Sequence, residues 1–366
     1  MPFGAAAFYN GRRAERVNLE VMRQHAKETA LRIAWIVLGL LIAAGCNASK
    51  PAPSAPAASD AGDPAGQLVK VSLGLNWYPE AEHGGFYAAL VNGYYRDAGL
   101  DVEIIPGGPS APVLQQVAGG SLDFGITNAD GLLLARAEEA PVVALMAPLQ
   151  TSPRCIMVHE KSGIQDFADL KNLTMAMGNS QPFYHYLRKK VPLEGVTIVP
   201  YQGSVAQFLT DPNFAQQGYV FSEPFVARQQ GGDPKTLMVS DLGFNPYTSV
   251  LFTSEDYLAA HANVAEKIVK ASVRGWEAYL TDPQATNERI HELNPEMSLE
   301  ALDYGVGALK PLVLDPLSAG EGLGAMTLER WRTLAEQLED LELIKPGAVD
   351  PQQAFTTRFL PAKGEN

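Results

Sequence analysis

Cysteine is scarce in this sequence, and positive charge is in short supply. The 366 residues include two cysteines, too few for a disulfide scaffold, and no CxxC pair that could hold zinc or carry out thiol redox chemistry. There are 28 basic residues against 41 acidic ones, a net charge of -13 that argues against a nucleic-acid-binding protein. Glycine (33) and proline (26) are too few and too irregularly spaced for a fibrous chain. The whole chain is 46% hydrophobic, enough to bury a core.

Motifs of common catalytic and cofactor sites are also missing. His291-Glu292 begins an HExxH pattern, but Pro295 stands where the second histidine is required. Gly322-Leu323-Gly324 begins a GxGxxG pattern that lacks its third glycine. The six histidines do not have the spacing of metal ligands, and GxSxG and Walker A motifs are absent. We therefore expect no metal site and no cofactor.

Long apolar runs are absent except for Ile33–Ala44. Twelve residues are too short to span a bilayer, which needs about 20. The run follows basic residues and ends in Ala43-Ala44-Gly45-Cys46, an order typical of a secretory signal. The cysteine directly after Ala-Gly resembles a bacterial lipoprotein signal, which implies that residues 1–45 are cleaved off and that Cys46 is lipidated. A plain signal peptide or an uncleaved anchor stays open, and so does a start of translation at Met22.

Residues 46–66 would then connect the lipid to the folded domain. They are mostly Ala, Pro, Ser, Asp and Gly without apolar periodicity, which is typical of a tether. Loss of residues 1–45 removes six of the 28 basic and three of the 41 acidic residues, so the remaining 321 carry 22 and 38, a net charge of -16. Such a domain stays soluble beside an anionic membrane. We expect a protein that is periplasmic or at the cell surface, anchored to a bacterial membrane through its lipid.

From residue 67 onward the pattern alternates between strand and helix, which predicts an α/β fold. We expect strands over 68–75, 101–105, 122–127, 141–149, 154–159, 173–177, 196–200, 218–221 and 248–253. Helices are expected between them, the first over 84–98, followed by a helical C-terminal segment over 254–261, 264–280, 283–293, 298–309 and 327–341. The sheets should be predominantly parallel. The length predicts about two domains by the ~150-residue rule, so we expect lobe 1 to comprise 67–151 and 248–366, and lobe 2 to comprise 152–247, with a ligand cleft between them.

Five segments in a fixed order carry a family resemblance. They are Leu75-Asn76-Trp77-Tyr78-Pro79 with His83-Gly84, Asn92-Gly93-Tyr94-Tyr95, Ala98-Gly99-Leu100-Asp101-Val102, Ser121-Leu122-Asp123-Phe124-Gly125-Ile126 and Gly218-Tyr219-Val220-Phe221-Ser222-Glu223-Pro224. Their order and spacing resemble the type II periplasmic-binding (Venus-flytrap) proteins of ABC importers, and within them the ThiY-like group that binds thiamine-pyrimidine precursors. Relatives bind riboflavin, nitrate and sulfonates. The resemblance implies a monomer that closes on a small-molecule ligand and delivers it to an ABC permease subunit and its ATPase.

The residues after the first expected strand are candidates for ligand binding. Asn76, Trp77 and Tyr78 lie at its carboxyl end, where aromatic rings can stack on a flat ligand. His83 follows at the start of a helix and could hydrogen-bond a ring nitrogen. The alternatives are that Trp77 fills the lobe interface and that His83 caps the helix.

Four further candidates lie at expected helix amino termini, where free N–H groups suit a polar acceptor. They are Ser110, Asn128, Asn179 and Ser180. Ordinary helix capping is the alternative for all four.

The resemblance implies that Glu223 meets an amino group of the ligand, and Tyr219 could stack nearby. The alternative for Glu223 is capping of the following helix. The candidate set contains no Lys or Arg, so a flat, neutral or amine-bearing heteroaromatic fits better than nitrate or a sulfonate.

An enzyme is the competing function class. Eukaryotic pyrimidine synthases share the fold, and the family needs an active-site lysine, a histidine and a cysteine-rich iron-binding run. His83 matches in position, but residues 241–253 contain no cysteine. Cys155 lies in an apolar run and is expected to be a buried small hydrophobe rather than a nucleophile. We therefore expect a binding protein, with a sensory or scaffold lipoprotein as the third possibility.

Overall fold

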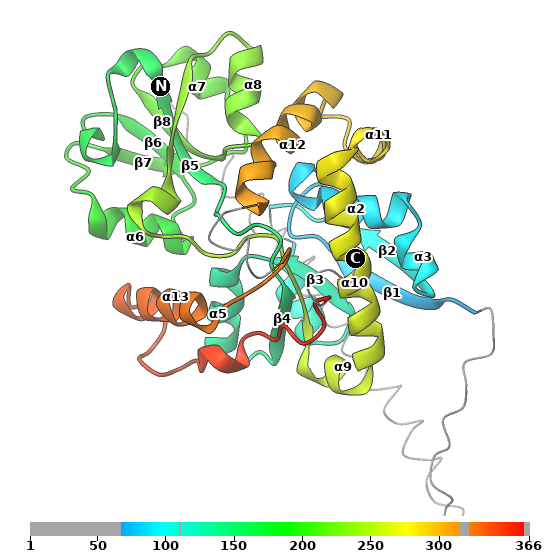
Figure 1. The fold of residues 1–366 in the computed structure, drawn as a ribbon. Coiled ribbons are helices and arrows are strands. Elements are labelled where there is room, and N and C mark those ends of the chain that lie inside the picture. The colour runs from blue at the N-terminus through cyan, green and yellow to red at the C-terminus, as the bar shows by residue number, and fades with distance from the viewer. Residues whose placement is uncertain (1–66, 110, 315–321, 362–366) are drawn as a thin grey trace, which may run out of the picture. The chain divides into compact units, whose positions relative to one another are not determined.

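The computed structural model describes residues 67–109, 111–314 and 322–361. The expected signal peptide, Cys46 and the tether to residue 66 lie outside the described residues, as does the candidate Ser110. The described residues belong to one unit of the chain, Pro64–Asn366, and form two five-stranded sheets that are flanked by helices (Figure 1).

The first sheet has the strand order β2-β1-β3-β10-β4. Its strands are β1 (Val69–Gly74), β2 (Leu100–Ile105), β3 (Phe124–Thr127), β4 (Val142–Met146) and β10 (Val250–Ser254). β1 pairs in parallel with β2 and β3, whereas β10 runs antiparallel to β3 and β4. The central strands β3 and β10, like β4, are buried along their whole length, because both faces of the sheet are covered.

The second sheet repeats this arrangement in the order β7-β6-β8-β5-β9. Its strands are β5 (Arg154–His159), β6 (Thr174–Met177), β7 (Thr197–Pro200), β8 (Phe214–Tyr219) and β9 (Pro234–Met238). β6 pairs in parallel with β7 and β8, whereas β5 runs antiparallel to β8 and β9. In each sheet one strand therefore runs opposite to the other four. Two of the four neighbouring strand pairs are parallel and two are antiparallel, so both sheets are mixed.

Two strands of the second sheet differ from the sequence expectation. β9 was not expected, because its sequence Pro-Lys-Thr-Leu-Met begins with proline and lacks a clear apolar alternation. The strand lies at the edge of the sheet, where proline is tolerated. β8 begins at Phe214, whereas the sequence analysis expected it to begin at Gly218. Its first residues were missed because Gln216 and Gln217 interrupt the apolar pattern.

Helices connect the strands and continue after β10. Before β10 they are η1 (Ala81–His83), α2 (Gly84–Val91), α3 (Tyr94–Asp97), α4 (Val113–Ala118), α5 (Ala129–Ala137), η2 (Glu160–Ser162), η3 (Phe167–Asp169), α6 (Pro182–Lys190), α7 (Ala206–Thr210), α8 (Glu223–Gln229) and η4 (Val239–Leu242). After it come α9 (Glu255–Ala260), α10 (Ala262–Thr281), α11 (Gln284–Leu293), α12 (Leu299–Val313), α13 (Leu328–Asp340) and η5 (Pro351–Gln353). The single helix expected over 84–98 is interrupted, because Gly93 adopts a left-handed φ of 77° that separates α2 from α3.

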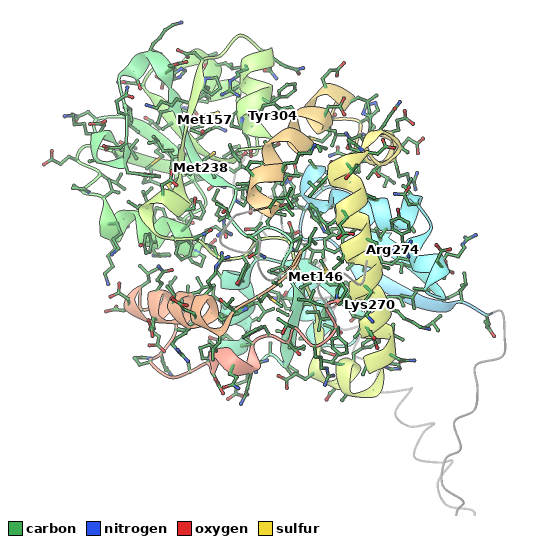
Figure 2. The ribbon with its side chains drawn as sticks, in the orientation of Figure 1. Met146, Met157, Met238, Lys270, Arg274 and Tyr304 are labelled. Atoms are coloured by element: carbon green, nitrogen blue, oxygen red, sulfur yellow. The ribbon has the colours of Figure 1, made fainter. Side chains whose placement is uncertain are left out.

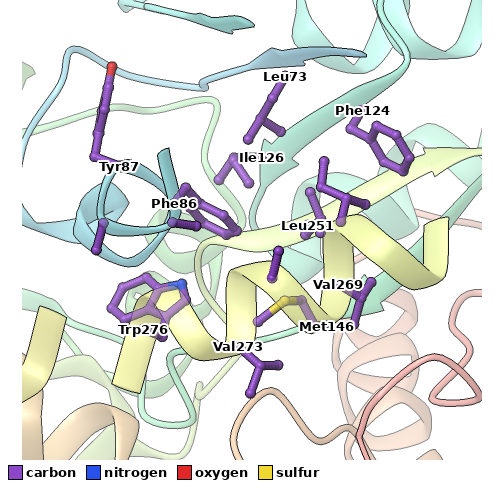
Figure 3. Packing of buried hydrophobic residues seen from close by; sticks show 14 of the residues in the cluster. Leu73, Phe86, Tyr87, Phe124, Ile126, Met146, Leu251, Val269, Val273 and Trp276 are labelled. Atoms are coloured by element: carbon purple, nitrogen blue, oxygen red, sulfur yellow. The ribbon is translucent and has the colours of Figure 1, made fainter. Parts of the chain in front are cut away.

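The close packing of α2 against α10 fixes the start of α2. A Cβ atom at Gly85 would lie 2.1 Å from the ring of Trp276, which is fully buried. The ring of Phe86 meets the same indole edge-on, with 5.9 Å between ring centroids (Figure 3). Because Gly84 and Gly85 carry no side chains, α10 packs closely against the start of α2. This packing fixes the position of the preceding turn η1, which borders the site described below.

Candidate functional site

A cavity of about 1160 Å³ lies at the ends of strands from both sheets. Its described lining residues are Asn76, Trp77, Tyr78, Glu80, Glu82, Pro109, Asn128, Arg154, Cys155, Gly178, Gln181, Phe183, Tyr201, Gln202, Gly203, Ser204, Val205, Ala206, Gln217, Gly218, Tyr219, Ser222, Glu223, Val226, Gln230, Asn294, Glu296 and Met297. Most of them follow the carboxyl ends of parallel strands, the usual position of a ligand site in such sheets.

Six of the ten residues that the sequence analysis singled out for binding line this cavity. They are Asn76, Trp77, Tyr78, Asn128, Tyr219 and Glu223. Asn179 and Ser180 are exposed and do not line it, although the neighbouring Gly178 does. The Gly178 N–H donates to Gln217 Oε1 at 2.6 Å, and α6 begins only at Pro182, so no free helix N–H groups are presented at residues 178–180.

His83 lies behind the cavity wall rather than in it. Its side chain is completely buried, and its Nε2 atom lies 3.1 Å from Asn76 Oδ1 and 3.2 Å from Glu82 Oε1. Burial lowers the pKa of His83 to about 3, so the ring is neutral at ordinary pH. In this position His83 orients Asn76 and Glu82, both of which line the cavity.

Glu223 is held by hydrogen bonds on both carboxylate oxygens. The Tyr201 hydroxyl donates to Oε1 at 2.5 Å, and the Tyr219 backbone N–H donates to Oε2 at 2.7 Å. Burial raises the pKa of Glu223, and these hydrogen bonds act against that rise. The carboxylate is the first residue of α8 and reaches back to β8, so its position is fixed before any ligand arrives.

Two acidic residues of this site were missed by the sequence analysis. Glu80 directly precedes the short η1 turn, Glu82 lies within it, and the two are 7% and 1% exposed. Burial raises the pKa of Glu82 to about 8, with a further rise from Glu223 and an opposing effect of Arg154. Burial also raises the pKa of Glu80 well above its usual value. A sequence signal was available, because two acids lie within the four residues before the Gly84-Gly85 pair, but their burial cannot be inferred from composition.

The candidate set contained no Lys or Arg, but the structure adds a basic residue, because Arg154 lines the cavity. β5 runs antiparallel to β8, and Arg154 pairs in register with Tyr219, so the first residue of β5 lies at the ligand edge of the sheet. Its guanidinium donates to Asp130 Oδ2 at 2.7 Å, and both side chains are buried. Burial opposes the charge of Arg154, but Asp130 and Tyr219 raise its pKa, so the guanidinium is charged and balanced by Asp130.

Helix α12 contacts elements on two sides of the cavity. The ring of Tyr304, labelled on α12 in Figure 2, stacks on Phe225 of α8 with 4.8 Å between centroids. One residue further, a Cβ atom at Gly305 would lie 2.7 Å from Cβ of Ala81 in η1. The helix therefore supports both η1, which carries Glu82, and α8, which begins with Glu223.

A family model described as NMT1/THI5 like matches residues 80–286, more than half of the chain. This chain belongs to the NMT1/THI5-like family. The family resemblance inferred from the sequence is thereby confirmed.

Sequence relatives of this NMT1/THI5-like protein include two binding proteins. The riboflavin-binding protein RibY of Chloroflexus aurantiacus is 27% identical over 349 residues, which cover 90% of this chain and 99% of the relative. The formylaminopyrimidine-binding protein of Halalkalibacterium halodurans is 26% identical over 338 residues, covering 90% and 98%. A 4-amino-5-hydroxymethyl-2-methylpyrimidine phosphate synthase of Saccharomyces cerevisiae is 25% identical over 251 residues, covering 63% and 72%.

Solved structures establish the fold. The periplasmic aliphatic sulphonate binding protein SsuA of Escherichia coli superposes with a TM-score of 0.62 at 14% identity, covering 79% of this chain and 92% of SsuA. The type II periplasmic-binding fold expected from the sequence is therefore confirmed. In the part of the chain that the structure describes, no helix is long and apolar enough to cross a membrane.

Proposed function

We propose that this protein is the solute-binding component of an ABC importer and that its cavity captures a small heteroaromatic ligand. The lining of the cavity carries the proposal. Trp77, Tyr201 and Tyr219 bring aromatic rings to one space from elements of both sheets, and Glu223 presents an anchored carboxylate to the same space. Aromatic rings stack on flat ligands, and a carboxylate accepts hydrogen bonds from ring amines.

The electrostatics of the lining support an uncharged or amine-bearing ligand. Arg154 is the only Lys or Arg among the described lining residues, and its charge is balanced by Asp130 at 2.7 Å. Glu80, Glu82 and Glu223 add carboxyl groups to the same wall. A nitrate or sulfonate would find no unbalanced positive charge among these side chains.

Two candidate ligands of different size are in line with what the relatives are named for. A thiamine-pyrimidine precursor is the ligand that the sequence resemblance favours. A flavin is the second candidate, and the cavity volume favours it, because about 1160 Å³ exceeds the ~300–1,000 Å³ typical of small-molecule sites.

We further propose that the two lobes, 67–151 with 248–366 and 152–247, close on the ligand. Supporting this, the two crossover segments run side by side: Leu149 bridges Thr248, and the Ser152 N–H donates to Asn245 Oδ1 at 2.8 Å. Paired crossovers of this kind allow lobes to rotate about a narrow axis. A ligand that contacts both lobes would favour the closed form.

The proposed location is outside the cytoplasm, with Cys46 lipidated and residues 46–66 as the tether. A monomer would then pass its ligand to a permease subunit and its ATPase. Mass spectrometry of the mature protein tests the anchor: a mass corresponding to residues 46–366 plus lipid is expected, and an unmodified amino terminus elsewhere would contradict it.

We propose that the protein is not an enzyme, although some relatives are synthases. Cys155 is completely buried, and its thiol donates to the Gly218 carbonyl at 3.3 Å. Burial, together with Glu223, raises the pKa of Cys155 well above its usual value, which disfavours the thiolate that nucleophilic chemistry needs. Turnover of riboflavin or a pyrimidine during incubation with the protein would contradict this proposal.

A thermal-shift screen tests the proposed function. The full-length chain is heated with riboflavin, formylaminopyrimidine, nitrate or an alkanesulfonate. The proposal expects a concentration-dependent rise in Tm with a heteroaromatic ligand, because ligands that bind the folded state stabilise it by mass action. A rise with the sulfonate or nitrate alone would contradict it.

A further inference from the structure

Three glutamates lie together on one wall of the cavity. Glu80, Glu82 and Glu223 all line it, and they come from the η1 turn after β1 and from the start of α8. Glu223 raises the pKa of both Glu80 and Glu82, and Glu82 raises that of Glu80, so the three carboxyls are close enough to interact. The cluster alone is not a binding site, and the partners of each oxygen decide what it can do.

Most polar atoms of this wall already have partners. Glu223 accepts from Tyr201 and from the Tyr219 backbone. Glu80 is hydrogen-bonded by the Ser222 side chain. Glu82 Oε1 lies 3.2 Å from His83 Nε2.

Glu82 Oε2 is different, because it is buried and has no hydrogen-bond partner among the described residues. The side chain is 1% exposed and lines the cavity. Buried carboxyl oxygens without a partner are uncommon, since leaving one unsatisfied costs free energy. A hydrogen-bond donor on a ligand bound in the cavity would supply the missing partner.

The charges around Glu82 restrict what that ligand can carry. Glu80 and Glu223 are its acidic neighbours, and Arg154, which lowers the pKa of Glu82, is itself balanced by Asp130 at 2.7 Å. An anionic substituent would be buried beside these carboxyl groups with no unbalanced cation to offset its charge. A hydroxyl or amino group can instead exchange hydrogen bonds with the Glu82 carboxyl, which is protonated at neutral pH and offers both an acceptor oxygen and an O–H donor.

We propose that Glu82 Oε2 accepts a hydrogen bond from a hydroxyl or amino group of the ligand, and that the Glu80–Glu82–Glu223 wall excludes the phosphorylated form of the same ligand. The inference rests on the proposed function and adds to it a specificity-determining residue, Glu82. The protein therefore takes up a dephosphorylated heteroaromatic bearing hydroxyl or amino groups.

Calorimetric titration of the full-length chain with matched ligand pairs tests the exclusion. The pairs are riboflavin with flavin mononucleotide, and 4-amino-5-hydroxymethyl-2-methylpyrimidine with its phosphate. We expect one neutral ligand to bind and its phosphate to bind at least about tenfold more weakly. Lumichrome, which has the flavin ring without the polyhydroxyl chain, should bind about tenfold more weakly than riboflavin if the flavin is the ligand.

Variants of Glu82 test the residue. Glu82→Ala removes the acceptor and should lower the affinity for the neutral ligand about tenfold. Glu82→Gln keeps an acceptor oxygen, so its affinity should stay within about threefold of the wild-type value. Glu336→Ala, an exposed glutamate on α13, is the matched control and should leave the affinity unchanged. Circular dichroism establishes that each variant is folded.

The outcomes separate the two proposals. Equal binding of neutral and phosphorylated forms, or unchanged affinity of folded Glu82→Ala, overturns the inference and leaves the proposed function standing. If Glu82→Ala does not fold, the phosphate comparison in the wild type decides. Absence of binding for both neutral ligands overturns the proposed function and the inference together.

Discussion

The amide of Asn128 donates a 3.2 Å hydrogen bond to the hydroxyl of Tyr219. Asn128 directly follows β3 of the first sheet, and Tyr219 is the last residue of β8 in the second. The Arg154–Asp130 pair joins the neighbouring elements β5 and α5 at 2.7 Å. Polar contacts between the two sheets' elements thus form part of the cavity wall, and they hold aromatic and charged side chains in place without a ligand.

The buried ion pair gives a stability prediction. Asp130→Asn removes the charge that balances buried Arg154, and loss of one partner of a buried pair typically costs about 3–5 kcal/mol. Urea denaturation should therefore show a much lower midpoint. Arg289→Ala, which breaks the exposed Arg289–Glu292 pair, is the control and should cost less than about 1 kcal/mol. Similar losses in both variants would contradict this account of the pair.

Trp77 gives a prediction for binding. The indole is partly buried at the cavity and meets Tyr78 edge-on at 5.5 Å between ring centroids, so it can be removed without opening the core. Trp77→Ala should lower the affinity for the heteroaromatic ligand by roughly tenfold, because stacking adds ~0.5–1.5 kcal/mol beyond burial. The Tm of the variant should change little. Tyr94→Ala, on α3 away from the cavity lining, should bind normally; wild-type affinity in Trp77→Ala would exclude a stacking role.

Buried Glu82 and His83 give opposite dependences on pH. The folded chain keeps a proton on Glu82 up to about pH 8, whereas the unfolded chain releases it near 4.5, so stability falls as pH rises from 4.5 to 8. His83 stays neutral in the fold down to about pH 3, whereas the unfolded chain protonates it near 6.5, so stability falls as pH drops below 6.5. The two effects offset each other between 4.5 and 6.5.

The free energy of unfolding should therefore be highest in this mildly acidic range. Raised pKa values of Glu80 and Glu223 add to the loss at higher pH. Urea denaturation across the pH range measures the profile. Glu82→Gln should flatten the alkaline side, and an unchanged slope above pH 6.5 in this variant would show that Glu82 is not protonated in the fold.

Helix packing behind the site gives a further prediction. A Cβ atom at Gly85 would lie 2.1 Å from the Trp276 ring, so Gly85→Ala should destabilise the fold by about 1–3 kcal/mol or more. Gly307→Ala in α12 is the matched control, because no atom lies within 4 Å of the added Cβ and alanine favours helix. It should be neutral or slightly stabilising in thermal denaturation. Equal Tm values for the two variants would contradict the packing described for Gly85.

The architecture was predictable because apolar periodicity and turn residues are local. β1 and α10 were anticipated from such patterns, and the strand β9 was not, since an edge strand that begins with Pro234 needs little apolar alternation. Residues after parallel strands, such as Trp77 and Asn128, were also accessible, because their place at the ligand edge follows from strand direction.

The charged part of the site was not predictable in this way. Arg154 was missed because β5 is antiparallel to its neighbours, which brings its first residue to the ligand edge; pairing direction is a tertiary property. Glu82 was missed because its burial depends on packing of η1 under α12 and beside His83. His83 itself was read as a contact residue, and the structure places it behind Asn76.

Calorimetric titration of the full-length chain with riboflavin and formylaminopyrimidine, in the wild type and in Glu223→Gln, tests the central claim most directly. We predict one-to-one binding of a heteroaromatic ligand that Glu223→Gln weakens by about tenfold or more, because a charge-assisted hydrogen bond is lost. Binding of an alkanesulfonate in place of either heteroaromatic, with affinity unchanged in Glu223→Gln, would contradict the account.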